Sequence, residues 1–323
     1  MADRILPITS TRLAHGLIVG PALLAVCPAA WAGPEGQRVV AGSASFARNG
    51  PVTTITASNN TIINYTGFNI GAHETVRFVQ PDASSRVLNR ISGAAPTIID
   101  GSLLSNGIVY IVNPAGVVFS EGSIINVGGL HAAAASITNA DFLGGIERFT
   151  DARGAVVNEG TIVAPEVMLF GRAVRNSGSV ISPNGVVAFV AGEDLYLGER
   201  GGRMYLRVDG AASPQAGGVT NLGRVEAPGG KVMVGAGDMF GVALHASSRI
   251  AAREVSVRAG RGSVASVSGV IDASTTAPGT TGGSIDIRSD HVGLFGATLD
   301  ASGASGGGDI RSDHVGLFGA TLD

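Results

Sequence analysis

The chain of 323 residues has little cysteine, little aromatic content and little charge, and each shortage excludes a class of protein. Cys27 is the only cysteine, so no internal disulfide forms and stability must come from a core or from stacked repeats. Charged residues make up 15% of the chain, below the usual quarter, yet 45% is hydrophobic, which excludes a disordered chain. No basic stripe is present, so nucleic acid is not a predicted partner.

What the chain does contain is glycine, 49 residues of it, and many short β-branched runs between turns. Ile108 to Val112 is a continuous run of the kind found in strands buried on both faces. Asn113-Pro114-Ala115-Gly116 suits a type I turn, and Val117 to Phe119 begins the next strand. No helical period fits this region. The pattern predicts an all-β fold, a right-handed single-stranded parallel β-helix.

The same region carries a family resemblance, because several motifs occur in one order at one spacing between about Ala41 and Pro165. These motifs are Asn89-Arg90-Ile91-Ser92-Gly93, Ile99-Asp100-Gly101, Ile111 to Phe119 and Gly128-Gly129-Leu130. In them the chain resembles the secretion domain of filamentous haemagglutinins and related two-partner-secretion exoproteins. The resemblance implies export through an outer-membrane β-barrel partner with periplasmic domains.

The resemblance also makes Asn113, Pro114, Ala115 and Gly116 the candidate secretion motif. The family usually has Asn-Pro-Asn-Gly there, so Ala115 is a departure. A second family motif, Asn-Pro-Asn-Leu, is matched only in its proline by Gln80-Pro81-Asp82-Ala83. Two interpretations of Asn113 stay open: it acts through folding of the turn, or the export machinery requires it directly.

The first 32 residues have the pattern of a signal peptide. Arg4 and Arg12 form a basic leader, and the apolar stretch from Gly16 to Ala25 is too short to span a bilayer. Small residues at Ala30 and Ala32 place cleavage between Ala32 and Gly33. After residue 32 no apolar run is long enough for a membrane helix, so no stable membrane insertion is predicted.

Three segments are expected to depart from regular coils. Val39 to Ala44 is predicted to form a first capping strand, because an open coil edge would pair with other chains. Residues 136–143, with cap-type residues before a short apolar pair, predict a short helix or turn outside the coil. Glu193 to Gly217 is an insertion that fits a side hairpin or an extra irregular coil.

An internal repeat, Asn-x-Gly-x-(Ile/Val)-x-(Ala/Ser)-Pro, begins at Asn158, Asn176 and Asn221. Asparagine and glycine tolerate left-handed backbone, so a sharp left-handed corner is predicted at each copy. We therefore expect a secretion-type domain over residues 33–245. Residues 246–323 are predicted to start a series of glycine-rich repeats.

Residues 286–300 recur unchanged at 309–323, a period of 23 that suits one β-helical coil. His291 and His314 would then stack, either as a surface row or as a metal or proton-sensing ladder, and the repeated aspartates would form a carboxylate ladder. No histidine has a second ligand at metal-like spacing, so no metal site and no cofactor are predicted. Because the second copy stops at Asp323 without a polar cap, we expect a longer repeat protein or a truncated reading frame.

The predicted function is that of a secreted or surface-exposed exoprotein, an adhesin or haemagglutinin-like protein with a host-cell or glycan receptor, and not an enzyme. Two alternatives remain: a polysaccharide-active or polysaccharide-binding β-helix, and the carrier stalk of a toxin. For an enzyme, the only dense charges in the middle of the chain are Glu193-Asp194 and Glu199-Arg200, and a solvated loop is the favoured explanation of them over a carbohydrate cleft.

Cleavage before Gly33 is testable by mass spectrometry of the exported protein. The expected mature N-terminus is Gly33, because the small residues Ala30 and Ala32 lie where the processing enzyme reads them. A mature chain that instead begins at a lipidated Cys27 would overturn the assignment.

Overall fold

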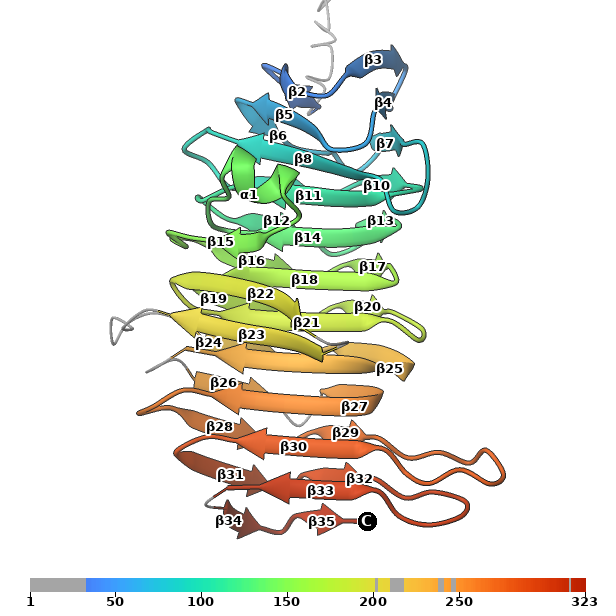
Figure 1. Cartoon of the computed structure of the whole chain (residues 1–323), viewed down its shortest axis with the longest axis vertical. Helices are drawn as coiled ribbons and strands as arrows, with labels where there is room; N and C mark the ends of the chain where they lie inside the picture. The colour runs from blue at the N-terminus through green and yellow to red at the C-terminus, as the bar shows by residue number, and fades with distance from the viewer. Residues whose placement is uncertain (1–32, 201–202, 210–217, 238–240, 245–247, 314) are drawn as a thin grey trace, which may run out of the picture. The chain divides into compact units, whose positions relative to one another are not determined.

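A computed structural model describes residues 33–323 except 201–202, 210–217, 238–240, 245–247 and 314, without the side chains of 197–209 and 241–244. Its strands wind through successive coils whose equivalent strands pair in parallel, which confirms the predicted β-helix (Figure 1). Three ladders run through the coils, and the first two share the long strands β25 and β27.

The first ladder contains β4 (Val52–Ala57), β7 (Thr75–Val79), β10 (Ser102–Ser105), β13 (Ile124–Asn126), β17 (Thr161–Val163), β20 (Ser179–Ile181), β25 (Arg224–Ala236), β27 (Arg249–Ala259), β29 (Val270–Asp272), β32 (Thr298–Asp300) and β35 (Thr321–Leu322). The second contains β5 (Thr61–Tyr65), β8 (Arg86–Ile91), β11 (Ile108–Val112), β14 (Gly129–Ala133), β18 (Glu166–Gly171), β21 (Val186–Ala191), β25, β27, β30 (Ser284–Arg288) and β33 (Asp309–Ser312). The third contains β9 (Thr97–Ile99), β12 (Val117–Phe119), β16 (Ala155–Asn158), β19 (Ala173–Asn176), β24 (Gly218–Asn221), β26 (Gly241–Leu244), β28 (Val264–Val267), β31 (His291–Phe295) and β34 (Val315–Phe318).

The interior of the coils is filled by alternate side chains of the strands in the three ladders, as the period of two requires; the side chains of β26 lie outside the described residues. In β11, Val109 and Ile111 point into this core, and Tyr110 and Val112 are buried on the opposite face. The predicted burial of β11 on both faces is therefore confirmed. The second buried face means that further elements cover the outside of this ladder.

Those covering elements are α1 (Asn139–Leu143) and an antiparallel sheet of β15 (Glu147–Phe149), β22 (Asp194–Arg200) and β23 (Arg203–Asp209). The Thr138 hydroxyl caps α1 by accepting the Asp141 N–H at 3.0 Å. The predicted external helix is confirmed, and the predicted insertion is a side hairpin formed by β22 and β23. Figure 1 shows α1 in front of β8 and β11, and β15, β22 and β23 in front of the later coils from β14 onward.

The N-terminal cap is built from antiparallel strands: β1 (Pro34–Glu35) on β6 (Gly67–Phe68), β2 (Arg38–Ala41) on β5, and β3 (Ala44–Asn49) on β4. The predicted cap is thus present, but Val39 to Ala44 is not one strand. The chain turns at Gly42, whose φ of +73° and contact of 2.5 Å between a built Cβ and the Thr61 hydroxyl both exclude a side chain.

Left-handed backbone was predicted at each copy of the repeated Asn-x-Gly motif, and this prediction was wrong. Neither its asparagines nor its glycines have positive φ. The asparagines instead form a buried ladder, in which Asn158 Nδ2 donates to Asn176 Oδ1 at 2.8 Å and Asn176 Nδ2 to Asn221 Oδ1 at 2.7 Å. Glycine is needed for close approach, since a Cβ on Gly178 would lie 2.1 Å from the carbonyl oxygen of Gly160 in the preceding coil.

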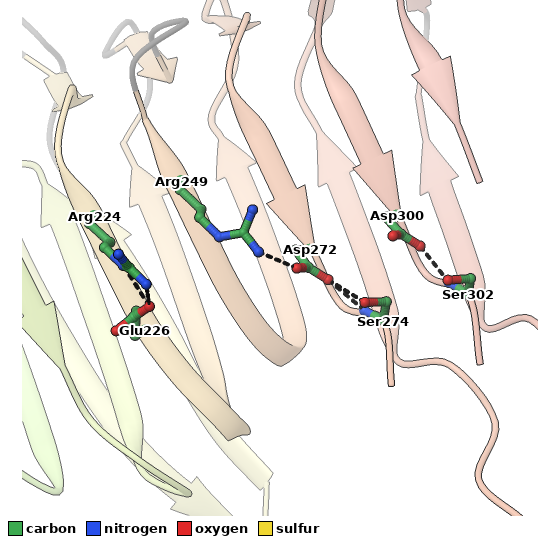
Figure 2. A network of polar contacts seen from close by, with 7 residues as sticks. All are labelled: Arg224, Glu226, Arg249, Asp272, Ser274, Asp300 and Ser302. Carbon is green, nitrogen blue, oxygen red and sulfur yellow. Dashed lines mark hydrogen bonds and ion pairs between the residues drawn. The ribbon is translucent and has the colours of Figure 1, made fainter. Parts of the chain in front are cut away.

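The carboxylate ladder was predicted between the repeated aspartates of residues 286–300 and 309–323, and its first pair, Asp286 and Asp309, does not form. One coil earlier, two other aspartates do align. Asp272 and Asp300 are in register, each accepting the N–H of the serine two residues later, and Asp272 also pairs with Arg249 at 2.5 Å (Figure 2). Asp286, however, lies beside Arg311 instead of Asp309. Strand pairing on this face follows an offset of 25 residues, two more than the repeat period of 23, so the identical segments do not lie on top of each other there. His314 lies outside the described residues, and the histidine row stays a prediction.

Among the described residues, no helix combines the length and the apolar character that crossing a lipid bilayer requires.

Gly178→Ala should destabilise the chain by at least about 2 kcal/mol, because the new methyl group collides with backbone that cannot rotate away. Gly307→Ala is the matched control, since Gly307 has nothing within 4 Å of a built Cβ and no positive φ. Urea denaturation midpoints measure both effects. Equal midpoints for the two variants would contradict the close-approach explanation.

Candidate secretion motif and a buried charge cluster

The candidate motif lies at the corner between β11 and β12, where the chain passes from the second ladder to the third. The Gly116 N–H donates to the Asn113 carbonyl at 2.9 Å, which closes the predicted turn. The Asn113 N–H donates to the Ala133 carbonyl of the next coil, also at 2.9 Å. Gly116 has a φ of +129°, so only glycine fits there without strain.

The Asn113 side chain is fully buried and uses its whole amide group. Its Nδ2 donates to the Ala95 carbonyl at 3.0 Å and to the Thr97 hydroxyl at 3.1 Å, and its Oδ1 accepts the Ala115 N–H at 3.0 Å. Ala95 and Thr97 belong to the preceding coil, so the Asn113 side chain links the turn to that coil. In the folded chain Asn113 is therefore a structural anchor with no surface to offer a partner.

Pro114 and Ala115 remain half-buried at the surface. They border a shallow open groove with Gly93, Ala94, Arg153 and Gly154. Ala115 therefore lies on the accessible side of the turn together with Pro114, and its departure from the family's asparagine leaves the Asn113 anchor intact.

The second family-like stretch, Gln80 to Ala83, forms a turn that is bonded to the next coil, where the Asn106 side chain accepts the Gln80 N–H at 2.8 Å and donates to the Gln80 carbonyl at 2.7 Å. Gln80 Nε2 donates to the Ser85 carbonyl at 2.6 Å, and the Asp82 carboxylate accepts the hydroxyls of Ser84 and Ser85. These hydroxyl bonds lower the pKa of Asp82.

Of the predicted cleavage pair, Ala32 lies outside the described residues. Gly33 is buried, and a Cβ there would lie 3.1 Å from Arg48 Nη1. Cleavage at this position stays a prediction.

Sequence reasoning missed a buried charge cluster on the outside of the second ladder. His131 of β14 is 2% exposed and lies with Nδ1 3.2 Å from Glu147 of β15 and Nε2 3.3 Å from Glu166 of β18. Its ring stacks on Tyr110 of β11 with centroids 4.3 Å apart, and the Tyr110 hydroxyl donates to Glu147. His131 has no second ligand at close spacing in the sequence, because Glu147 and Glu166 lie 16 and 35 residues further along the chain.

The protonation of this cluster follows from its two carboxylates. Burial lowers the pKa of His131, but the charges and contacts of Glu147 and Glu166 outweigh burial and raise the pKa to about 10. Burial raises the pKa of Glu147, and His131 reverses that effect, so the net shift is downward; contact with His131 likewise lowers the pKa of Glu166. The cluster is a cation between two anions at neutral pH.

The carboxylates considered for a glycan-cleaving site have structural partners instead. Glu193 pairs with Arg172 at 2.9 Å, and Asp194 accepts the backbone N–H of Asp151 at 2.9 Å, so both fasten the side hairpin. The side chains of Glu199 and Arg200 lie outside the described residues. Among the described residues, no group of three His, Cys, Asp or Glu side chains is arranged to hold a metal ion.

A capped parallel β-helix with external elements and an anchored Asn-Pro-x-Gly turn defines a class of exported exoprotein domain. Residues 32–287 match the sequence profile of the TPS secretion domain. The chain belongs to this two-partner-secretion family, whose members are exported across the outer membrane and are secreted or displayed at the surface. The family resemblance and the predicted localisation are thus confirmed.

Known proteins from Haemophilus influenzae resemble different extents of the chain. The solved HMW1 secretion domain has a TM-score of 0.72 and 26% identity, covering 90% of this chain and 84% of that one. A heme/hemopexin-binding protein of strain KW20 Rd is 36% identical over 163 residues, which is 47% of this chain and 18% of that protein. A second heme/hemopexin-binding protein is 34% identical over 101 residues. The chain thus spans less than a fifth of the length of these curated relatives.

Proposed function

We propose that this chain is the front part of an exoprotein that a dedicated outer-membrane β-barrel transporter with periplasmic domains exports in extended form. The observation that carries the proposal is the match of residues 32–287 to the TPS secretion domain. A chain with no cysteine after residue 32 has no disulfide to obstruct passage in extended form. Folding outside then releases free energy coil by coil, which hinders return.

Within this route, we assign Asn113 a role that depends on folding. Its side chain is buried and bonded to Ala95, Thr97 and Ala115, so the folded turn presents no Asn113 atom for recognition. Loss of the anchor leaves the Thr97 hydroxyl and the Ala115 N–H without this partner, which costs about 1–3 kcal/mol per buried orphan group. A less stable early coil releases less folding free energy, so it opposes return of the chain through the transporter less strongly.

Asn113→Ala should therefore reduce secretion by the cognate transporter severalfold while intracellular synthesis is unchanged. Thr97→Val is the matched variant, because it removes the same hydrogen bond on the partner side and keeps Asn113. Secretion of both is quantified by immunoblotting of culture medium against cell lysate, and their stability by urea denaturation. Asn126→Ala, at an exposed position, is the control.

The comparison separates the two interpretations of Asn113. Loss of secretion in proportion to loss of stability in both variants supports the folding role. Normal secretion of Thr97→Val at equal instability would instead assign Asn113 to direct recognition in the extended chain. Normal secretion of Asn113→Ala would remove Asn113 from the site.

We further propose that the exported protein works as an adhesin and has no catalytic activity. The engagement of Glu193 and Asp194 in structural contacts supports the second part. The similarity to heme/hemopexin-binding proteins covers 18% of the first relative, so it supports shared export and carries no ligand to this chain.

The exported protein, purified from medium, should bind host cells or erythrocytes and release no reducing sugar from pectin or related glycans. Cell binding by fluorescence and a reducing-sugar assay measure the two properties. Glycan cleavage, or heme binding without cell binding, would contradict the adhesin assignment.

A further inference from the structure

Residues 136–152 form a strap that crosses the outside of the second ladder between β14 and β16. Its ends are joined by the bridge between Ser136 and Thr150, with N–H to carbonyl distances of 2.8 and 2.9 Å. Phe142 and Phe149 of the strap are buried on the outer core of the ladder. The strap thus closes over an apolar face that the coils alone would leave exposed.

Polar contacts fasten the strap both to the side hairpin and to the coils. Toward the hairpin, β15 pairs with β22, the Asp151 N–H donates to Asp194 at 2.9 Å, and the Ala152 N–H donates to the Glu193 carbonyl at 2.9 Å. Arg90 Nη2 donates to the Ile137 carbonyl at 2.9 Å, and this guanidinium is fixed in its charged state over the working pH range. Glu147 also contacts His131 and Tyr110 of the second ladder. Asp141 of α1 pairs with Arg148, which also belongs to the strap, at 3.0 Å. This ion pair therefore does not attach the strap to the coils.

We propose that His131, held between Glu147 and Glu166, is a proton-controlled latch that fastens this strap onto the coil stack. The latch joins three elements that are separate in sequence, β14, β15 and β18, through one imidazolium. If His131 loses its proton, the two half-buried carboxylates face a neutral ring and lose their shared counter-charge. The strap carries Glu147 and is paired through β15 with β22, so the strap and the side hairpin are the elements that would move away together.

The charged and titratable groups around His131 act in known directions. Glu147 and Glu166 flank the ring, Tyr110 stacks beneath it, and Arg86 of β8 lies near Tyr110 and Glu147, with its guanidinium 5.2 Å from the Phe142 ring centroid. Glu166 is 40% exposed at its side chain, so it gives solvent protons a route to the cluster. Burial, followed by Glu147, raises the pKa of Tyr110, so its hydroxyl stays protonated.

The pH dependence follows from linkage. His131 has a raised pKa, so its stabilisation is complete below about pH 6.5 and is lost as pH rises toward about 10. Glu147 and Glu166 have lowered pKa values, so their stabilisation is present above about pH 4.5 and is lost as pH falls further. The strap is therefore held most tightly in mildly acidic solution and loosens in alkaline solution.

Hydrogen exchange of the secreted chain at pH 6.5 and pH 8.5, corrected for intrinsic rates, tests the latch. The opening equilibrium of strap amides should rise by up to about 100-fold, since one proton gives at most tenfold per pH unit. Amides of β16 and β19 in the coil stack should change less than about threefold. The latch is independent of the export route, because the measurement uses the folded chain.

Glu147→Gln should reduce the pH effect on the strap to less than about threefold, and Glu121→Gln, an exposed carboxylate in a turn, should preserve it. Strap protection that is equal at both pH values in the wild-type chain, or opening that spreads equally through β16 and β19, would overturn the proposal. Should Glu147→Gln not fold, NMR titration of the histidine ring carbons in the wild-type chain decides. One histidine with a midpoint near 10 supports the latch, and midpoints that all lie near 6.5 overturn it.

Discussion

The backbone pairing of each coil with the next is the interaction on which the rest of this structure depends. It fixes the spacing between coils, so a side chain at a corner must fit between backbones already in contact. A Cβ on Gly185 would lie 1.8 Å from the Pro165 carbonyl oxygen, and one on Gly230 would lie 2.2 Å from that of Gly185. Much of the glycine in this chain is therefore a consequence of coil spacing, and not of left-handed backbone.

Coil spacing also decides which polar groups the interior admits. A buried amide is stable only where the neighbouring coil supplies a partner, because an orphan group costs about 1–3 kcal/mol. The Asn158, Asn176 and Asn221 ladder meets this condition by repetition, each amide bonding to its copy one coil away. Asn113 also has partners, but without a repeated asparagine: it bonds to the Ala95 carbonyl and the Thr97 hydroxyl of the preceding coil.

Local pattern in the sequence predicted what local geometry decides: the strands, the Asn113 turn, the cap, the external helix and the side hairpin. It did not predict contacts that depend on stacking. His131 meets Glu147 and Glu166 only because an insertion folds back over two coils, and no period relates the three. The identical copies 286–300 and 309–323 are displaced by two residues at Asp286, because pairing follows the inward Ile285 and Ile310.

The pairing pattern would allow coil-by-coil folding of a chain that emerges with its N-terminal end first, as the proposed export route requires. The cap strands β2 and β3 pair with strands close in sequence, so they offer a template before later coils arrive. Each later strand pairs with one already in place. The strap emerges before Glu166, yet its carboxylate shares His131 with Glu166, so its attachment is complete only after β18 has joined the stack. External elements of this kind consolidate coils that have already formed, and they cannot start the stack.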